Sequence, residues 1–168
     1  MSYNTTEPTN KNFLSPLGFK FSIQKTPNVN YFVQQVSMPG VSFASAEMPT
    51  PFQRIPIAGT QLSYGDLSLT FKIDEDMENY LELYNWLTSI SFPDNFSQYP
   101  GEREVYSDAT LTILTSAYRP KHNIVFRDLY PVDLGGFAML TTASDVDHVE
   151  CIATFKYRIF DIVPATAS

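Results

Sequence analysis

The sequence contains little of several residue types on which catalytic and metal sites depend. Among its 168 residues are one cysteine, two histidines and seven glycines. The single cysteine, Cys151, excludes an internal disulfide framework and any cysteine-rich metal site. The chain also lacks a P-loop, a Gly-x-Gly-x-x-Gly loop, a Gly-x-Ser-x-Gly turn and a His-Glu-x-x-His pair. The short signatures of nucleotide-binding and hydrolytic enzymes are therefore missing.

A long apolar run is missing as well. Residues 26–46 carry no charge, but they include Asn, Gln, Pro and Gly side chains and are not continuously apolar. A bilayer span needs about 20 mostly apolar residues. The polar residues 1–11 do not resemble a signal peptide. We therefore expect no membrane anchor and a protein that folds in a reducing cytoplasm, with the uncharged segment buried against another protein.

Positive charge is scarce and unevenly placed. The formal net charge of −7 argues against a nucleic-acid binder, whose affinity depends on Lys and Arg. Residues 1–73 have a net charge of +2, whereas residues 74–168 have a net charge of −9. This asymmetry suggests one strongly acidic surface, although simple solubility explains it equally well.

Apolar and aromatic residues are abundant and predict a globular domain. They make up 43% of the chain, with 13 Phe, 10 Tyr and 1 Trp. A chain of this length forms one domain with a substantial core. We expect residues 1–15 to be a flexible N-terminal arm, because they are polar and contain few apolar side chains, and residues 16–164 to be a single domain.

Strict alternation of apolar and polar residues predicts half-buried strands. It is clearest at 18–24 and at 66–73, where Leu67, Leu69 and Phe71 share one face. Further strands are predicted at 31–36, 109–114, 123–126 and 149–162. The turn at 26–28 precedes the strand at 31–36, and residues 128–131 close the strand at 123–126. In the last strand the apolar phase breaks at Phe160, which predicts a bulge or a change of partner.

One convincing helix follows the strand that ends at Ile73. Asp74 is a favourable N-cap residue, and acidic residues fill the first turn. The helix is predicted to end before Pro93. Its apolar face is predicted to consist of Met77, Tyr80, Leu81, Tyr84, Leu87 and Ile90, broadened by Leu83 and Trp86.

Residues 39–65 predict an extended arm. Prolines recur among short apolar pieces, and Ala58-Gly59-Thr60 is predicted to be the tip. The segment is too apolar to be a solvated loop, and exposed apolar surface on a soluble chain marks an interface. The residues predicted to contact other subunits are Met38, Pro39, Val41, Phe43, Met48, Phe52, Ile55 and Ile57.

These elements predict a mainly β protein. We expect an antiparallel β-barrel or sandwich with one flanking helix, at about 74–91, and an extended arm, at about 39–65. Exposed edge strands in such a fold are protected either by closure of the barrel or by pairing with neighbouring copies.

Candidate chemistry is weak, and we expect no catalytic residue, metal or cofactor. The group Asp145, Asp147, His148 and Glu150 is interpreted as a solvated turn and strand start rather than as a metal site. Cys151 lies on the apolar phase of its strand and is interpreted as a core residue. The acidic residues 74–82 are interpreted as a helix start rather than as paired catalytic carboxylates.

The order of these elements resembles the tail tube proteins of contractile-tailed bacteriophages and their tube-initiating baseplate relatives. The resemblance covers about residues 13–163. It rests on the strand ending in Met38-Pro39-Gly40, the returning arm Ile55-Pro56-Ile57-Ala58-Gly59, the strand and helix joined by Asp74-Glu75, the helical Asn85-Trp86-Leu87 and the final Ala153-Thr154-Phe155-Lys156-Tyr157. The strand–Asp–Glu–helix–Trp junction is its most specific part.

The resemblance implies a structural protein rather than an enzyme. It implies rings, typically of six subunits, stacked into a hollow tube inside a sheath, and hence self-association and contact with tail sheath and baseplate proteins. Viral DNA would pass through the lumen without specific binding, and an acidic lumen would suit that passage. The protein would belong to the virion and be assembled in the host cytoplasm.

Two alternatives remain open. The chain could form a baseplate ring of the same fold that starts the tube and is present in few copies. From another class, it could be a carbohydrate-binding β-sandwich that uses exposed aromatic side chains. Self-assembly of the purified protein distinguishes the first alternative from the tube subunit, and glycan binding by a monomer would favour the second.

Overall fold

Two antiparallel sheets that share one strand form the body of the protein. The computed structural model describes residues 11–91, 105–141 and 148–165. Along the chain, the elements are β1 (Phe19–Ile23), α1 (Pro27–Phe32), β2 (Val33–Ser37), β3 (Val41–Pro49), β4 (Arg54–Tyr64), β5 (Leu67–Lys72), α2 (Glu78–Ser91), β6 (Ser107–Leu114), β7 (Pro120–Leu134), β8 (Glu150–Lys156) and β9 (Ile159–Pro164). The main sheet has the strand order β1-β6-β7-β8-β5-β2, and β9 also pairs with β7.

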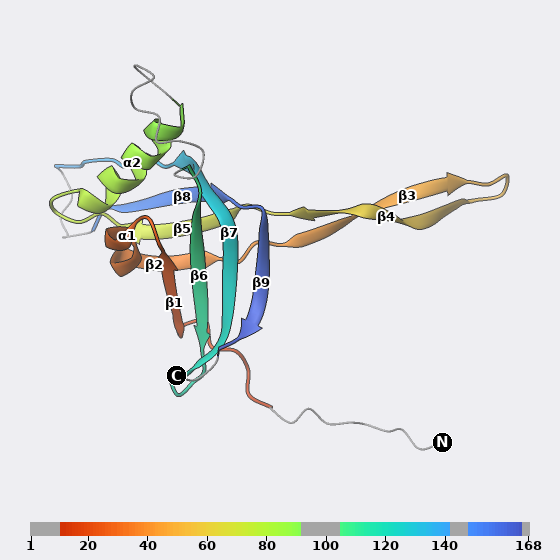
Figure 1. Cartoon of the computed structure of the whole chain (residues 1–168), viewed down its shortest axis with the longest axis horizontal. Helices are drawn as coiled ribbons and strands as arrows, with labels where there is room; N and C mark the ends of the chain where they lie inside the picture. The colour runs from red at the N-terminus through yellow and green to blue at the C-terminus, as the bar shows by residue number, and fades with distance from the viewer. Residues whose placement is uncertain (1–10, 92–104, 142–147, 166–168) are drawn as a thin grey trace.

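The long strand β7 joins the two halves of the body (Figure 1). Its first part pairs with β6 and β9, and its last part, from Tyr130 to Leu134, pairs with β8. Between these parts Asp128 has a positive φ of 54°, a conformation that Asp tolerates better than most residues. This change of partner lets β7 turn from the β1–β6–β9 group to the β8–β5–β2 group, which cross each other steeply in Figure 1.

The core lies between the two groups of strands. Alternate residues of β1, β5, β6 and β8 point into it, as the burial of Phe21, Leu69, Leu111 and Phe155 shows. α2 covers the core with Leu83 and Trp86, which are 1% and 2% exposed. The burial of these large apolar side chains is the main source of the fold's stability.

Two buried or half-buried asparagines fasten the helices to strand ends. The Asn30 side chain accepts a hydrogen bond from Ile23 N at 2.7 Å and donates one to Ile23 O at 2.9 Å, which ties α1 to β1. The Asn79 side chain is fully buried, donates to Lys72 O at 2.8 Å and accepts from Asp74 N at 3.4 Å. Each amide therefore satisfies backbone groups that a strand end leaves without partners.

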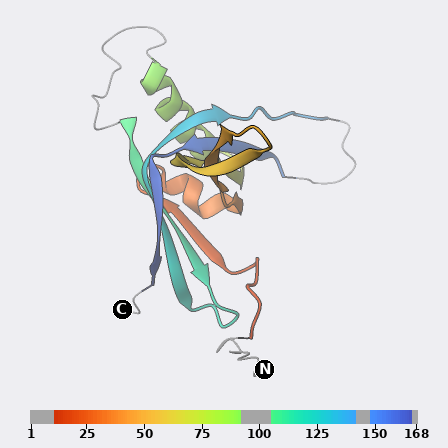
Figure 2. The same cartoon turned by 90° about the vertical axis from the view of Figure 1, so that its right-hand side faces the viewer.

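The hairpin β3–β4 projects from the body at the end opposite α2 (Figure 1). In Figure 2 the hairpin points toward the viewer. It forms a separate two-stranded sheet. The predicted arm over residues 39–65 is therefore confirmed. Its predicted tip is wrong: the chain turns at Thr50–Gln53, where Thr50 N donates to Gln53 O at 3.3 Å, and Gly59 lies within β4.

The predicted mainly β class and antiparallel strands are confirmed, with corrections at several elements. A short second helix, α1, occupies the predicted turn at 26–28 and the start of the predicted strand at 31–36, because Pro27 stands at its first turn, where proline fits. The strand predicted to close at 128–131 continues to Leu134. The predicted change of partner near Phe160 is confirmed, since β8 ends at Lys156 and β9 pairs with β7.

The flanking helix is confirmed, but its start and its buried face differ from the prediction. α2 begins at Glu78 rather than at Asp74, because residues 74–77 form a turn in which Met77 N donates to Asp74 O and Met77 has a φ of 57°. The buried residues of α2 are Asn79, Leu83 and Trp86. Leu81 and Tyr84, predicted to be core residues, are 47% and 49% exposed.

Some predictions fall outside the described residues or concern absences. The flexible arm at 1–15 lies mostly in residues that the structure does not describe, as do Asp145 and Asp147. Among the residues described, no helix has the length and apolar character needed to cross a bilayer. The same residues bring together no group of three or more metal-ligating side chains.

Candidate assembly surface: the arm and the charged sheet

Within the described part of the chain, the arm is left almost entirely exposed. All nine residues of β3 are exposed, and in β4 only Gly59 and Tyr64 are partly covered. Nine strand residues span about 30 Å. A β-hairpin of this kind is marginally stable alone in water, so its apolar side chains point to a partner that the single chain does not supply.

An aromatic cluster fixes the base of the arm to the body. The Tyr64 ring lies 6.0 Å from the Tyr157 ring and 5.5 Å from the Phe160 ring, and Phe126 contacts both of those rings. Edge-to-face contacts of this type add to the apolar burial. The Tyr157 hydroxyl also donates a hydrogen bond to Gly65 O at 3.0 Å. These contacts set the direction in which the arm leaves the body.

Most of the predicted interface residues are exposed on the arm or at its base. Met38, Val41, Phe43, Met48, Phe52, Ile55 and Ile57 are between 38% and 98% exposed, with Phe52 at the tip the most exposed. Pro39 is buried at the base of the hairpin and lies beside Gly65. Six of the remaining seven are therefore brought together on one projecting element, with Met38 just before its base. Their contact with another copy stays a prediction.

Sequence reasoning missed two features of the arm. Leu62 is 47% exposed and lies opposite Phe43, so it belongs with the apolar set. Glu47 and Arg54 form an ion pair at 3.1 Å, with both side chains more than half exposed. The apolar character of Leu62 and the opposite charges of Glu47 and Arg54 were visible in the sequence, but their pairing depends on the position of the tip.

An irregularity interrupts the hairpin near its middle. The register shifts between Phe43 and Ser45, which lie opposite Leu62 and Ala58. Gly59 passes so close to the Ala44 carbonyl that a side-chain carbon there would collide with the backbone oxygen. Glycine is therefore required at this position by close approach and not by a tip.

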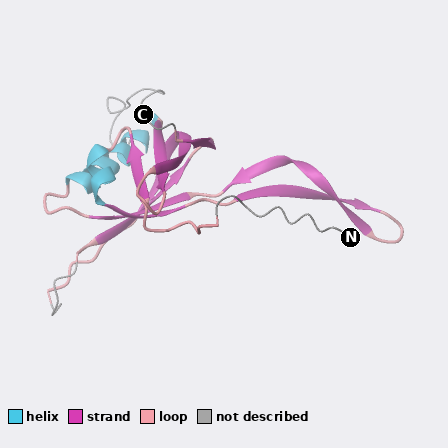
Figure 3. Ribbon diagram, turned by 90° about the horizontal axis from the view of Figure 1, so that it is seen from below, coloured by secondary structure: helices cyan, strands magenta, loops and turns pink. Residues whose placement is uncertain are grey.

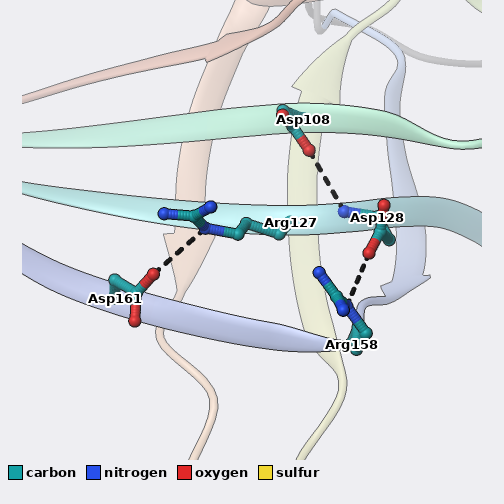
Figure 4. Close-up of polar contacts among 5 residues, drawn as sticks. All are labelled: Asp108, Arg127, Asp128, Arg158 and Asp161. Atoms are coloured by element: carbon teal, nitrogen blue, oxygen red, sulfur yellow. Dashed lines mark hydrogen bonds and ion pairs between the residues drawn. The ribbon is translucent and has the colours of Figure 1, made fainter.

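A second candidate surface is the outward face where β6, β7 and β9 meet (Figure 4). Arg127 pairs with Asp161 at 3.1 Å, and Arg158 pairs with Asp128 at 2.6 Å. Asp108 accepts a hydrogen bond from Asp128 N at 3.1 Å. Both arginines are thus neutralised by a carboxylate on a neighbouring segment, which leaves this face polar but without a free row of cations.

The acidic residues predicted to share one surface gather in part at the start of α2. Glu75, Asp76 and Glu78 are exposed there, with Glu82 one turn further along. Burial raises the pKa of Glu82, although hydrogen bonds from Asn28 partly oppose this effect. The Asn28 side-chain amide donates to Glu82 at 2.9 Å. Glu82 therefore joins α1 to α2, whereas the other three carboxylates face solvent.

The remaining sequence candidates occupy ordinary structural positions. Cys151 is buried, its thiol donates to Gly135 O at 3.1 Å, and burial raises its pKa. A thiol with a raised pKa is a poor nucleophile at neutral pH. Glu150 lies opposite Lys72 at the start of β8, and His148 precedes that strand.

Comparison with known proteins places this chain in a family. The model of a family described as phage tail tube protein matches residues 4–163, which is nearly the whole chain. No curated protein matches the sequence.

Solved structures with the same fold come from contractile assemblies. The chain matches the tube terminating cap of the anti-feeding prophage with a TM-score of 0.69 and 12% identity, over 98% of this chain and 100% of that one. It matches a chain in the sheath-tube complex of an extracellular contractile injection system with a TM-score of 0.67 and 14% identity, over 92% of this chain and 94% of that one. The baseplate of the anti-feeding prophage gives a TM-score of 0.60 and 11% identity, over 86% and 90%. At these identities the matches establish a shared fold.

Proposed function

Because the chain belongs to the phage tail tube protein family, we propose that it is a subunit of the inner tube of a contractile tail or a tail-like particle. The observation that carries this proposal is the exposed apolar arm on a body of tube-protein fold, since the described residues outside the arm leave its strands uncovered beyond its base. The role is structural, and we assign no catalytic residue, metal or cofactor to it.

The subunits form rings, typically of six, that stack into a hollow tube. Among the described elements, β1 and β2 each end the strand order, and β9 pairs with β7 alone. Unpaired strand edges favour pairing with another chain. Neighbouring copies can therefore continue the sheets around the ring, while the arm reaches toward another copy.

Sheath and baseplate proteins are the proposed partners outside the tube. Structures of the same fold occur in a sheath-tube complex, a baseplate and a tube terminating cap, which supports contacts of this kind. The exposed acidic start of α2 provides a charged surface for such a partner.

The lumen carries cargo without binding it, and viral DNA is the proposed cargo. A net charge of −7 repels phosphates, and the two arginines on the β6–β7–β9 face are paired with carboxylates. We propose assembly in the host cytoplasm and a final location in the virion.

Negative-stain electron microscopy of the purified full chain tests this function. We expect rings that grow into tubes as the protein concentration rises. A protein that stays monomeric at the highest soluble concentration would contradict the proposal.

The same experiment distinguishes a second candidate, a baseplate ring that starts the tube. Its support is the shared fold with a baseplate component. Such a protein would stop at single rings under conditions in which a tube subunit polymerises. A carbohydrate-binding role is not favoured, because aromatic side chains such as Phe21, Phe71 and Phe155 are buried in the core.

A further inference from the structure

We propose that the apolar residues of the arm form one continuous stripe on one side of the arm, and that this stripe lies along a second copy of the chain. The inference rests on the proposed function, which requires only that copies associate. It adds which side chains of the arm meet the partner and which do not.

The strand register divides the arm into two faces. In an antiparallel pair, directly opposed residues point to the same face, and faces alternate along each strand. Near the body, Phe43 lies opposite Leu62 and Val41 lies opposite Tyr64. Apolar residues there occupy the odd positions of β3, and Ser42, opposite Ser63, lies on the other face.

In the distal half of the arm the apolar residues move from the odd-numbered to the even-numbered positions of β3. Met48 lies opposite Ile55 and Ala46 lies opposite Ile57, so the apolar side chains occupy the even positions of β3. The Glu47–Arg54 ion pair independently shows that these two charges share the other face. The apolar set therefore moves from one face of the ribbon to the other between Phe43 and Ala46.

The ribbon itself turns over along its length. In Figure 1, β3 lies below β4 near the body and above it toward the tip. The two strands also cross once in the perpendicular view of Figure 3. Strands that exchange places in both views belong to a ribbon whose faces have been reversed, as the strong twist of two-stranded ribbons allows.

The change of the apolar residues from one face to the other and the turning-over of the ribbon offset each other. The apolar phase changes at the irregularity around Ala44 and Gly59, and bulges of this kind increase the local twist. The proximal apolar residues and the distal ones consequently face the same side of the molecule. We call the resulting set the arm stripe: Val41, Phe43, Ala46, Met48, Ile55, Ile57 and Leu62.

A second copy is the occupant that fits this stripe. Together with Phe52 at the tip, the stripe exposes on the order of 600 Å² of apolar surface, close to the roughly 800 Å² per partner of a standard interface. The charges within β3 and β4, Glu47 and Arg54, pair with each other, so the arm offers no net charge to an acidic or basic partner. An arm of about 30 Å is long enough to reach across much of a neighbouring subunit.

Matched substitutions on adjacent residues test the stripe. We compare Phe43→Glu with Ser42→Glu near the body, and Ala46→Glu with Ser45→Glu beyond the irregularity. Each pair differs by one position and therefore by face. We expect Phe43→Glu and Ala46→Glu to lower the assembled fraction in sedimentation by about tenfold or more, and the two serine variants to stay within about twofold of the wild type.

A photocrosslinker at Phe43, and separately at Met48, identifies the occupant. In assemblies mixed from ¹⁴N- and ¹⁵N-labelled protein, both positions should link to peptides of another copy. Crosslinks within one copy, equal sensitivity of both faces, or flotation of wild-type protein with liposomes that stripe substitutions abolish would each overturn the inference. Wild-type protein that never assembles would instead contradict the proposed function itself.

Discussion

The Tyr157 hydroxyl donates a hydrogen bond to the Gly65 carbonyl oxygen at 3.0 Å, across 92 residues of sequence. Tyr157 directly follows the core strand β8, and Gly65 directly follows β4 at the base of the arm. Gly65 N in turn donates to the carbonyl oxygen of Gly40, the residue before β3, at 2.9 Å. One side chain of the body thus holds both strands of the arm at their common base.

Tyr157→Phe should loosen this base without unfolding the body. The substitution keeps the ring contacts with Tyr64, Phe126 and Phe160 but leaves the Gly65 carbonyl without this donor. We expect a loss of about 1 kcal/mol in the free energy of unfolding, measured by urea denaturation. Tyr64→Phe, which removes a hydroxyl from the same cluster, is the matched control and should cost less. Equal losses in the two variants would contradict a specific role for the bond.

The stability of the protein should depend on Tyr157 at high pH. Burial raises the pKa of Tyr157 to about 12. In the unfolded chain a tyrosine ionises near its ordinary pKa of about 10. The stabilising contribution of Tyr157 is therefore complete below pH 10 and is lost as the pH rises through the folded pKa. Between pH 10 and 12, wild-type protein should lose more stability in urea denaturation than Tyr157→Phe, and parallel curves would contradict this.

Gly59→Ala should distort the arm while the body stays folded. The added methyl group would collide with the Ala44 carbonyl oxygen, so the backbone of the hairpin must shift. Gly40→Ala is the control, because a methyl group at Gly40 meets nothing within 4 Å. We expect Gly59→Ala to reduce assembly several-fold and to leave the thermal unfolding of the body nearly unchanged, and Gly40→Ala to do neither. Normal tubes from Gly59→Ala would show that the arm tolerates the distortion.

The buried face of α2 can be tested with two leucines. Leu83→Ala should destabilise the protein by about 2–5 kcal/mol, because Leu83 is 1% exposed and its loss leaves a cavity. Leu81→Ala should change stability by less than about 0.5 kcal/mol, because Leu81 is 47% exposed. Chemical denaturation of both variants measures the difference. The reverse order would restore the face predicted from helical spacing alone.

The strands of the body were easier to predict from the sequence than the buried face of α2. Strands β1 and β5 were predictable, because each turns one face to the core and the alternation of Phe21 and Ile23 or of Leu67 and Leu69 records it. The face of α2 was predictable only in part: Leu83 and Trp86 are buried as expected, whereas Leu81 and Tyr84 are about half exposed.

The arm was predictable in its existence but not in its geometry. Its many exposed apolar residues and prolines separate it from the core pattern. Its tip was misplaced because Gly59, which looks like a turn residue, serves a close approach between strands. Which residues meet a partner depends on twist and register together, and a linear pattern contains neither.

The charged face in Figure 4 leads to the last prediction, which concerns DNA. Arg127 and Arg158 are each neutralised by a carboxylate, Asp161 and Asp128 respectively. Replacing both carboxylates by Asn keeps the side-chain shape, and Asn also tolerates the positive φ at position 128. The substitutions would leave two arginines free to contact phosphates.

We therefore expect Asp128→Asn/Asp161→Asn to bind double-stranded DNA more tightly than the wild type in filter binding at low salt. The slope of log affinity against log salt should steepen by about 0.9 for each arginine that contacts a phosphate, because each contact releases counterions. Asp133→Asn is the control, because it removes one negative charge from β7 while Arg127 and Arg158 keep their partners Asp161 and Asp128. Tighter DNA binding by the double variant alone would show that the ion pairs of the two arginines keep this face from binding DNA. An equal gain per charge removed in Asp133→Asn would instead show that net charge alone governs the interaction.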